Sequence, residues 1–294
     1  MSTDLDNPFE DFNEAKYLSL NPDIADAVER GDFQSGWEHF LRFGINEVRP
    51  GLSEKTKIVE QLTKQVVSIP VPPSTLRIRV HGAEALTEFH KIGRVVALDL
   101  ESTIYSHQIS LSDRSNILDF GCGSGRIITW FQNLYSQSNF YGSDIDAEAI
   151  AWCQSNLSDR AEFKVNENLP PLPFESDFFD LVYSISIFTH LPEEMHLEWL
   201  RELQRVCKPG AYLLLTVHGA HCFPLQSPTE KAKLEQDGFY YLKGDGTDGL
   251  PEFYQNCYHT EAYIRDRWSE FFEIQQIVTK GVAKFQDLVV CKAL

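Results

Sequence analysis

Three glycines spaced two residues apart, Gly121, Gly123 and Gly125, lie in the stretch NILDFGCGSGRIITWF, which covers residues 116–131. The acid Asp119 comes two residues before the first glycine. Glycine lets a backbone approach a ligand closely, and the N-terminus of a following helix attracts polar groups. The pattern therefore predicts a nucleotide site in a strand-to-helix turn. A purely structural turn is the alternative.

The spacing of these glycines argues against a dinucleotide. A dinucleotide-binding turn has the pattern G-x-G-x-x-G, whereas here the third glycine comes one residue early and Arg126 follows it. A negative group at Asp119 opposes a pyrophosphate, but it suits an ammonium group or a backbone N–H. We therefore expect a ligand with a positive amino group. S-adenosylmethionine carries an α-amino group and a sulfonium.

A second acid ends the next apolar segment, FYGSDID. Asp144 lies 25 residues after Asp119, at a place where a carboxylate can accept both ribose hydroxyls. Ile145 follows it and is expected to pack on an adenine face. NAD enzymes share this acid, so it does not discriminate between cofactors. The alternative role is an N-cap of the next helix, for which Ser143 and Asp146 are rival candidates.

Alternating apolar and helical segments must position these residues. Buried strands are expected at residues 116–120, 139–144, 161–165, 178–188 and 211–218, and helices at 124–135, 146–157 and 192–207. This alternation predicts an α/β fold with a mostly parallel sheet and helices on both faces. The last two strands, 271–278 and 286–293, are separated by only seven residues, so they must form an antiparallel hairpin.

The segments before the sheet are expected to cover it. Val71 to Pro73 should be extended, because proline restricts itself and its predecessor. We expect this stretch to pass over the surface or to lie across the mouth of a site. Residues 83–104 have the apolar spacing of one helix. His81 and His90 could close a lid over the cofactor.

The first fifty residues read as a separate set of short helices. Pro22 begins one helix that Gly31 ends, and a second runs from Ser35 to Gly44. The pattern YL…NPDIA…EHF resembles a helical module on bacterial glycosyltransferases and other proteins of polysaccharide clusters. We expect three parts: a helical module (1–53), a linker and lid helix (54–115), and a catalytic domain (116–294). We expect the module to make packing or oligomer contacts, and substrate binding is the alternative.

From residue 84 onward, the chain resembles the class I S-adenosylmethionine-dependent methyltransferases. LDFGCGSG is similar to the first motif of that family, YGSDID to its second, and LQRVCKPGAYLLLT to its helix, turn and fifth strand. The resemblance implies a Rossmann-like seven-stranded sheet and S-adenosylmethionine as the cofactor. Asn168 stands where an Asp often reads the adenine amino group. The cofactor-binding residues that the resemblance implies are Asp119, Gly121, Cys122, Gly123, Gly125, Asp144, Ile145, Asn168 and Ser184.

Methyl transfer needs a general base only if the nucleophile arrives protonated. His190 follows the fourth strand and His218 the fifth, and ligands bind at such carboxyl ends. These two histidines are the catalytic candidates, and loop packing is the alternative for His190. His221 is a weaker candidate, and His259 is expected to be structural. The aromatic residues Tyr254 and Tyr258 could line the acceptor side or fill a core.

Composition and motifs exclude several classes. The formal charge of −17 and the absence of a basic run argue against nucleic acid as the partner. Six scattered cysteines, no signal-peptide core and no long apolar run indicate a reduced, cytoplasmic protein without a membrane span. No acid stands directly at the end of the fourth strand, where metal-dependent catechol-type enzymes need one, so we expect no metal. DNA amino-methylating enzymes carry an Asn-Pro-Pro-Tyr-like motif there, and this chain does not.

The sequence thus predicts a methyltransferase from a bacterial biosynthetic setting that acts on a small molecule. The acceptor atom is expected to be a hydroxyl oxygen or an amine nitrogen, with carbon as the alternative, and a sugar or another biosynthetic intermediate would fit. One alternative is a non-catalytic S-adenosylmethionine-binding regulator or scaffold. The other is a nicotinamide dehydrogenase, against which the glycine spacing and the terminal hairpin argue.

Overall fold

A computed structural model of the chain describes residues 14–40, 69–81, 86–112, 114–223, 227–244 and 251–294. In this part of the chain none of the helices is long and apolar enough to span a membrane. The helices are α1 (Glu14–Leu20), α2 (Pro22–Glu29), α3 (Gly36–His39), α5 (Ser74–His81), α6 (Leu86–Ser106), α7 (Ile128–Leu134), α8 (Ala147–Asn156), α9 (Glu193–Val206), α10 (Pro228–Asp237) and α11 (Glu261–Arg267). The strands are β1 (Asn116–Phe120), β2 (Asn139–Asp144), β3 (Glu162–Val165), β4 (Phe179–Ser184), β5 (Cys207–Val217), β6 (Phe239–Leu242), β7 (Asn256–His259), β8 (Phe272–Val282) and β9 (Gln286–Ala293).

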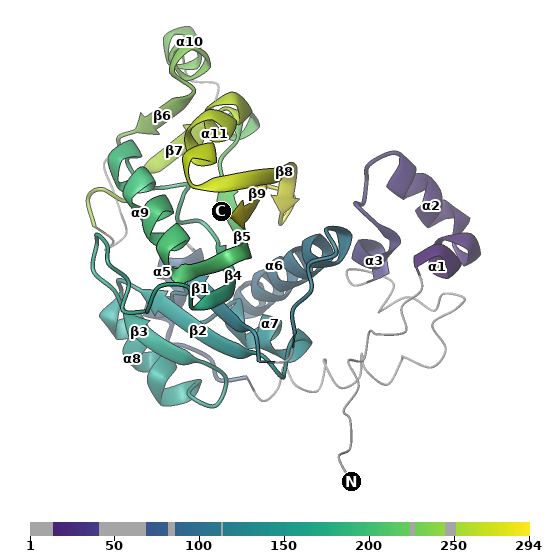
Figure 1. Cartoon of the computed structure of the whole chain (residues 1–294), viewed down its shortest axis with the longest axis horizontal. Coiled ribbons are helices and arrows are strands. Elements are labelled where there is room, and N and C mark those ends of the chain that lie inside the picture. Colours follow the sequence, from purple (N-terminus) through teal and green to yellow (C-terminus); the bar gives the residue numbers. More distant parts are fainter. Residues whose placement is uncertain (1–13, 41–68, 82–85, 113, 224–226, 245–250) are drawn as a thin grey trace.

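Seven strands form one sheet in the order β3-β2-β1-β4-β5-β9-β8 (Figure 1). The first five pair in parallel, and β9 is antiparallel to both β5 and β8. The predicted fold class, including the terminal antiparallel hairpin, is confirmed. The strand order reverses beside β1, so the turn after β1 lies at the switch point where open α/β sheets bind ligands.

Each face of the sheet carries its own core, because alternate residues of a strand point to opposite faces. In β5, Leu213 and Leu215 pack with Trp199 and Leu200 of α9, whereas Leu214 packs on the other face with helices α6, α7 and α8. These side chains are essentially inaccessible to solvent. Truncating such a leucine to alanine typically costs roughly 2–5 kcal/mol. The two cores hold the carboxyl ends of the strands in a fixed arrangement.

Three segments differ from the sequence-based expectation. Helix α7 begins only at Ile128, because residues 121–127 form the glycine turn. Helix α9 ends at Val206, and the Lys-Pro-Gly segment already belongs to β5, where Gly210 has a φ of +80° and the register with β4 shifts. Residues 74–81, expected only as part of an extended covering stretch, form helix α5, although Val71 to Pro73 before it are not helical.

An insertion between β5 and β8 was also missed. It contains α10 and a small antiparallel sheet, β6-β7, followed by α11. His259 in β7 donates its backbone N–H to the carbonyl oxygen of His218 at 2.9 Å, which ties the insertion to the end of β5. The insertion thereby brings distant aromatic residues to the edge of the main sheet.

The N-terminal helices α1, α2 and α3 lie together beside α6 (Figure 1). Tyr17, Ile24, Trp37 and Phe40 form their small core, and Leu98 of α6 packs against it. As predicted, Gly31 follows the end of α2, with a φ of +77°. Gly44, the Pro50-Gly51 pair and the expected boundary at residues 53–54 lie outside the described residues.

Candidate functional site

The glycine turn after β1 is closed by backbone hydrogen bonds to the neighbouring strand. Gly121 and Cys122 both donate their N–H groups to the carbonyl oxygen of Ser143, at 2.7 and 3.1 Å. Gly121, Gly123 and Gly125 have φ values of +82°, +51° and +71°, a region that side chains disfavour. A Cβ atom at Gly121 would lie 2.3 Å from the Ile187 side chain. The turn therefore requires glycine for both backbone and packing reasons.

Asp144, at the end of β2, points into this turn. Its Oδ2 atom accepts a hydrogen bond from the N–H of Gly123 at 2.7 Å, and its Oδ1 atom accepts one from the N–H of Asp146 at 2.9 Å. Burial raises the pKa of Asp144, and these backbone donors oppose the shift. The N-cap of α8 is Asp146, which accepts from Glu148 and Ala149. The capping alternative for Asp144 is therefore wrong, and its carboxylate has lone pairs left for a ligand.

Asp119 is buried on the side of β1 that faces the glycine turn. The residue is 1% exposed, and its carboxylate oxygens form no close hydrogen bond among the described residues, although the Tyr183 hydroxyl lies near enough to lower its pKa. Burial raises its pKa to about 8, and the nearby Tyr183 hydroxyl and Arg126 guanidinium oppose this shift. A buried carboxyl without a close hydrogen bond is costly to the fold. It is suited to a ligand that brings a positive or donating group.

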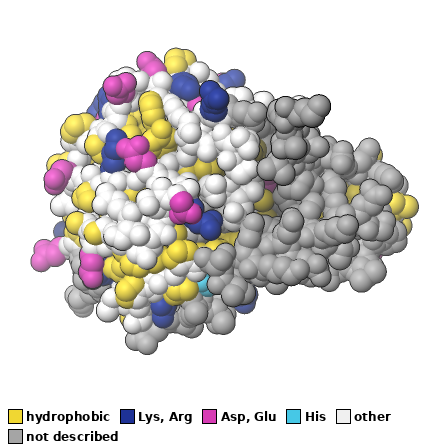
Figure 2. All heavy atoms as spheres, turned by 90° about the horizontal axis from the view of Figure 1, so that it is seen from below, with side chains coloured by type: hydrophobic (Ala, Val, Ile, Leu, Met, Phe, Trp, Pro, Cys, Tyr) yellow, Lys and Arg dark blue, Asp and Glu magenta, His cyan; other side chains and the backbone are white. Residues whose placement is uncertain are grey.

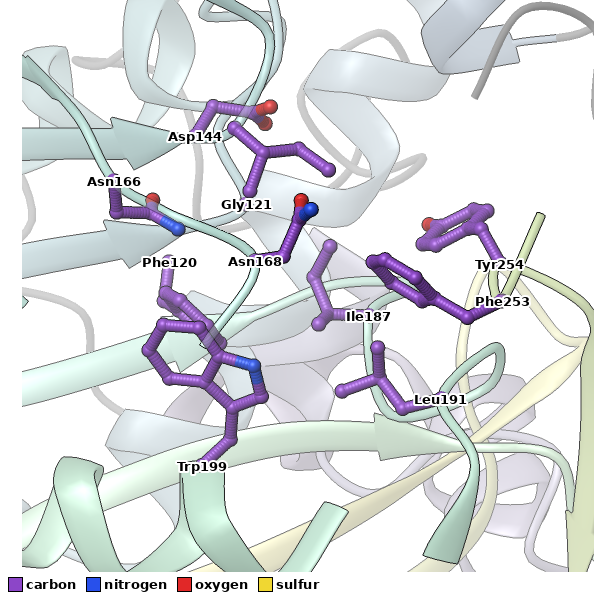
Figure 3. A pocket seen from close by; sticks show the side chains of 11 residues that line it. Phe120, Gly121, Asp144, Asn166, Asn168, Ile187, Leu191, Trp199, Phe253 and Tyr254 are labelled. Atoms are coloured by element: carbon purple, nitrogen blue, oxygen red, sulfur yellow. The ribbon is translucent and has the colours of Figure 1, made fainter. Parts of the chain in front are cut away.

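A pocket lies at the carboxyl ends of β1, β2 and β4 (Figure 3). Its empty volume, including the part open to solvent, is about 360 Å³. Asp144 and Asn168 approach it from one side, and Phe253 and Tyr254 approach it from the other. The residues that line it are Phe120, Gly121, Asp144, Ile145, Asn166, Asn168, Ile187, Leu191, Trp199, Phe253 and Tyr254.

Four of the predicted cofactor-binding residues line this pocket: Gly121, Asp144, Ile145 and Asn168. The other predicted residues do not. Gly123 and Gly125 shape the turn, Asp119 lies buried beside it, and Cys122 is buried with its thiol facing the carbonyl oxygen of Gly123. Ser184 is fully buried and donates its hydroxyl to the carbonyl oxygen of Phe120 at 2.8 Å. This contact joins β4 to β1 at the base of the site.

Several lining residues were missed by the sequence analysis. Asn166 directly follows β3, and its Oδ1 atom accepts a hydrogen bond from the Ser143 hydroxyl at 2.6 Å. A polar residue at the carboxyl end of a strand was the available signal for it. Trp199 in α9 and Phe253 in the insertion had no such signal. Their positions depend on tertiary packing.

The two catalytic candidates lie close together beyond Tyr254. The rings of His190 and Tyr254 stack with centroids 4.4 Å apart, and those of His190 and His218 are 5.8 Å apart. Burial lowers the pKa of both histidines to about 4, so both are neutral at pH 7 but are weaker proton acceptors than an ordinary histidine. Neither lines the pocket itself. Tyr254, which does, connects them to it.

The remaining histidines have other surroundings. His221 Nδ1 lies 3.6 Å from Asp287 Oδ1, and its Nε2 atom lies 3.0 Å from the carbonyl oxygen of Phe285. His259 stacks on His196 inside the core, at 4.8 Å between centroids. His90 contacts Trp130 edge to face. Among the described residues, no group of three or more His, Cys, Asp or Glu side chains could hold a metal ion.

Helix α5 covers the glycine turn. Its Arg79 side chain donates to both carboxylate oxygens of Asp146, at 2.8 and 3.1 Å, and forms a second ion pair with Glu148 at 2.7 Å. A Cβ atom at Gly123 would lie 2.3 Å from Val80. These contacts hold helix α5 across the glycine turn and against the start of α8. Of the two expectations for this stretch, the one that places it across the site is therefore the one observed.

Comparison with known proteins agrees with this geometry. Residues 118–215 match the family described as "Methyltransferase domain". The tRNA (carboxymethyluridine(34)-5-O)-methyltransferase of Arabidopsis thaliana is 35% identical over 112 residues, which are 38% of this chain and 26% of the relative. A protein of Oryza sativa named "Probable tocopherol O-methyltransferase, chloroplastic" is 32% identical over 134 residues, 44% of this chain and 34% of the relative. The chain thus spans about a quarter to a third of these relatives.

A solved structure shows the same fold. It contains a methyltransferase of Haloferax volcanii in complex with the activator Trm112, and the match has a TM-score of 0.52 at 13% identity, covering 76% of this chain and 99% of that chain. Residues 118–215 are thus similar to a methyltransferase domain. The residues present fit S-adenosylmethionine, because Gly121 of the turn and Asp144 line the pocket, and the carboxylate oxygens of the buried Asp119 form no close hydrogen bond among the described residues.

Proposed function

We propose that the whole chain transfers a methyl group from S-adenosylmethionine to an oxygen or nitrogen atom of a small molecule. The observation that carries this proposal is the pair of acids at adjacent strand ends. Asp144 is held by two backbone N–H groups and lines the pocket, and Asp119 is buried beside the same turn without a close hydrogen bond among the described residues. One acid would accept from the ribose hydroxyls, and the other would face the amino group.

Adenine recognition is proposed for the apolar part of the pocket. Ile145 and Trp199 supply flat or branched apolar surface, which suits a base face. Asn168 carries an amide that can accept from the adenine amino group and donate to a ring nitrogen. We assign no cofactor contact to Ser184 or to the Cys122 thiol, because both side chains face backbone carbonyls of the fold.

Bound S-adenosylmethionine supplies a methyl carbon that its sulfonium makes electrophilic. The chain must then hold an acceptor in line with that carbon, and alignment alone can supply much of the rate. His190 and His218, both neutral, are proposed to take the proton that a hydroxyl or amine loses. Tyr254, between them and the pocket, is proposed to orient the acceptor.

A small acceptor is favoured over a nucleic acid. The formal charge of −17 opposes a polyanion, and on the face shown in Figure 2 basic side chains lie among acidic ones without gathering into a patch. Two relatives are named as O-methyltransferases, of a tRNA and of tocopherol, and two others as sterol 24-C-methyltransferases, so the preference for a small acceptor rests on the charge and not on the relatives. All six cysteines are free, which supports a reducing compartment such as the cytoplasm.

We also propose that the chain divides into the three parts expected from its sequence, with boundaries at residues 53–54 and 115–116.

Calorimetric titration tests the cofactor assignment. Wild type should bind S-adenosylmethionine and S-adenosylhomocysteine but not NADH. Asp144→Ala should weaken that binding at least about tenfold, because it removes a charged acceptor worth roughly 1.5–3 kcal/mol. The exposed Asp237→Ala serves as the matched control. Binding of NADH, or equal affinity in Asp144→Ala and wild type, would contradict the proposal.

Turnover separates an enzyme from a regulator. Methyl-labelled S-adenosylmethionine is incubated with the full chain and a panel of hydroxylated and amino compounds. Transfer of label to any compound, reduced by His218→Gln without a change in cofactor affinity, supports a catalytic role. Tight cofactor binding without transfer across the panel would favour the non-catalytic alternative.

A further inference from the structure

A cluster of polar side chains lies next to the pocket. The proposed function assigns no role to this cluster. Ser186 follows β4, and Gln286 begins β9. Gln286 is only 9% exposed, and its Nε2 atom donates to the Ser186 Oγ atom at 2.8 Å. Its Oε1 atom is buried and has no hydrogen-bond partner among the described residues. Buried amide oxygens in native proteins are nearly always paired, so this atom calls for a donor from outside the fold.

Ser186 is held in place by three separate segments. Its N–H donates to the Thr216 hydroxyl in β5 at 2.8 Å, and its carbonyl oxygen accepts from the Tyr254 hydroxyl at 2.7 Å. With Gln286, this makes three tethers on a residue whose φ is +64°. Side chains disfavour this backbone region, and such strain persists where the surroundings enforce it, often at functional sites. The cluster is therefore fixed before any ligand arrives.

The cluster joins the cofactor pocket directly. Ile187, the residue after Ser186, lines the pocket, and so does Tyr254. His218 is close by in the sheet, because it follows Val217, which pairs with Asp287 next to Gln286. The Nδ1 atom of His218 is likewise buried without a partner in the described part of the chain. Gln286 does not line the pocket itself, and it lies behind the part of the wall to which Ile187 and Tyr254 belong.

Aromatic rings surround His218, close to this cluster. Tyr258 stacks on His218 with centroids 5.6 Å apart, and Phe223 meets Tyr258 edge to face at 4.9 Å. Phe285 lies against His218 at 5.7 Å and is 55% exposed, which is unusual for so large an apolar side chain. An aromatic ligand could add further ring contacts of the same kind. The hydrogen-bond acceptor at Gln286 lies within this aromatic surrounding.

We propose that Gln286 determines acceptor specificity by accepting a hydrogen bond from a hydroxyl group of a phenol-type acceptor. The inference rests on the proposed function and narrows its acceptor class to ring compounds with a hydroxyl donor. A site with a buried polar group rejects an analogue that leaves this group unpaired. A ring compound whose hydroxyl hydrogen is replaced by a methyl group should therefore bind more weakly.

Phenol and anisole are the probes, since they differ by that hydrogen and one methyl group. Each is titrated by ligand-observed NMR into the full chain saturated with S-adenosylhomocysteine. We expect phenol to bind about fivefold or more tightly than anisole, the effect of one hydrogen bond. Gln286→Met, which keeps length and removes the amide, should abolish that preference. Gln276→Met, on the exposed part of the same hairpin, should leave it unchanged.

Thermal melting and S-adenosylhomocysteine affinity check that the Gln286→Met protein is folded. If that variant does not fold, Gln286→Glu, which keeps an oxygen at the same place, should retain the preference for phenol. Equal binding of both probes to wild type, no binding of phenol, or a preference that survives Gln286→Met would each overturn the inference while leaving the proposed function intact. Failure of wild type to bind S-adenosylhomocysteine would remove the proposed function, and the inference with it.

Discussion

Two regions at this edge of the sheet are built in different ways: the cofactor end around the glycine turn, and the acceptor end around Ser186 and Gln286. At the cofactor end, Asp119 and Asp144 come from neighbouring strands only 25 residues apart in the sequence, and backbone N–H groups hold the second acid. At the acceptor end, Ser186 and Gln286 are 100 residues apart and meet only because β4, β5 and β9 lie side by side.

This difference indicates in which half of the site side chains can be substituted without disturbing the other half. Backbone groups that hold a carboxylate do not depend on the identity of distant side chains. The acceptor end depends on long-range packing of rings and amides from the insertion and the terminal hairpin. Changes there should therefore alter the acceptor without weakening the cofactor site, as the contrast between Asp144→Ala and Gln286→Met tests directly.

The largest effect is expected at the first glycine of the turn. Gly121→Ala would place a Cβ atom 2.3 Å from Ile187 at a φ of +82°, so it must displace a pocket wall as well as strain the backbone. We expect S-adenosylhomocysteine binding to be weakened about tenfold or more, because the displaced Ile187 side chain lines the pocket. Calorimetry measures the affinity.

Gly31→Ala is the matched control for this substitution. Gly31 has nearly the same φ, +77°, but a Cβ atom there meets nothing within 4 Å. Both variants should lose thermal stability, and only Gly121→Ala should lose affinity. Equal affinity in the two variants would show that the turn tolerates a side chain and that the two ends do not differ as argued.

A smaller effect is expected from the charge state of Asp119. Its pKa of about 8 means that the free protein holds a proton there at pH 6–7, and a cationic amino group would displace that proton. Cofactor affinity should therefore rise with pH, approaching tenfold per unit between pH 6 and pH 7. Asp119→Asn should bind weakly and lose this dependence, as titration at several pH values would reveal. A flat profile for wild type would separate Asp119 from the amino group.

The raised pKa of Asp119 also affects the stability of the folded protein. A carboxyl whose pKa is raised in the folded state holds its proton more tightly than in the unfolded chain, so it destabilises the fold as pH rises from about 4 to 8. Asp119→Asn should remove this loss and raise the Tm of the cofactor-free protein at pH 8 by about 2 °C or more. Near pH 4, close to the ordinary pKa that the carboxyl has in the unfolded chain, melting curves of the two proteins should differ less.

The smallest effect is expected at the cover of the turn. Arg79→Ala removes the ion pairs of α5 with Asp146 and Glu148, of which Glu148 is well exposed and weakly coupled. We expect S-adenosylhomocysteine to dissociate about two- to fivefold faster in stopped-flow measurements, with a weaker salt dependence. Arg30→Ala, which breaks the exposed pair with Asp32 in the N-terminal helices, should change nothing. Unchanged dissociation in Arg79→Ala would mean that α5 covers the turn without controlling release.

Sequence reasoning reached the cofactor end because its information is local. Glycines with positive φ, an acid before them and an acid at the next strand end follow from the needs of one turn, and the structure places Gly121 and Asp144 on the pocket. It did not reach Trp199, Phe253 or Asn166, which line the same pocket. Ser184 shows the converse, since the family resemblance implied a cofactor contact for it, and its hydroxyl instead joins two strands.

By itself, the sequence determined the class of sheet, its antiparallel end and the position of the glycine turn. Period-two and helical spacing, together with short loops, leave few ways to connect such strands. Only the tertiary structure decided that α5 covers the turn, that Tyr254 links the pocket to His190, and that Gln286 lies beside Ser186 with an unpaired oxygen. Those contacts join segments far apart in the chain, and their geometry depends on the packing of the whole fold.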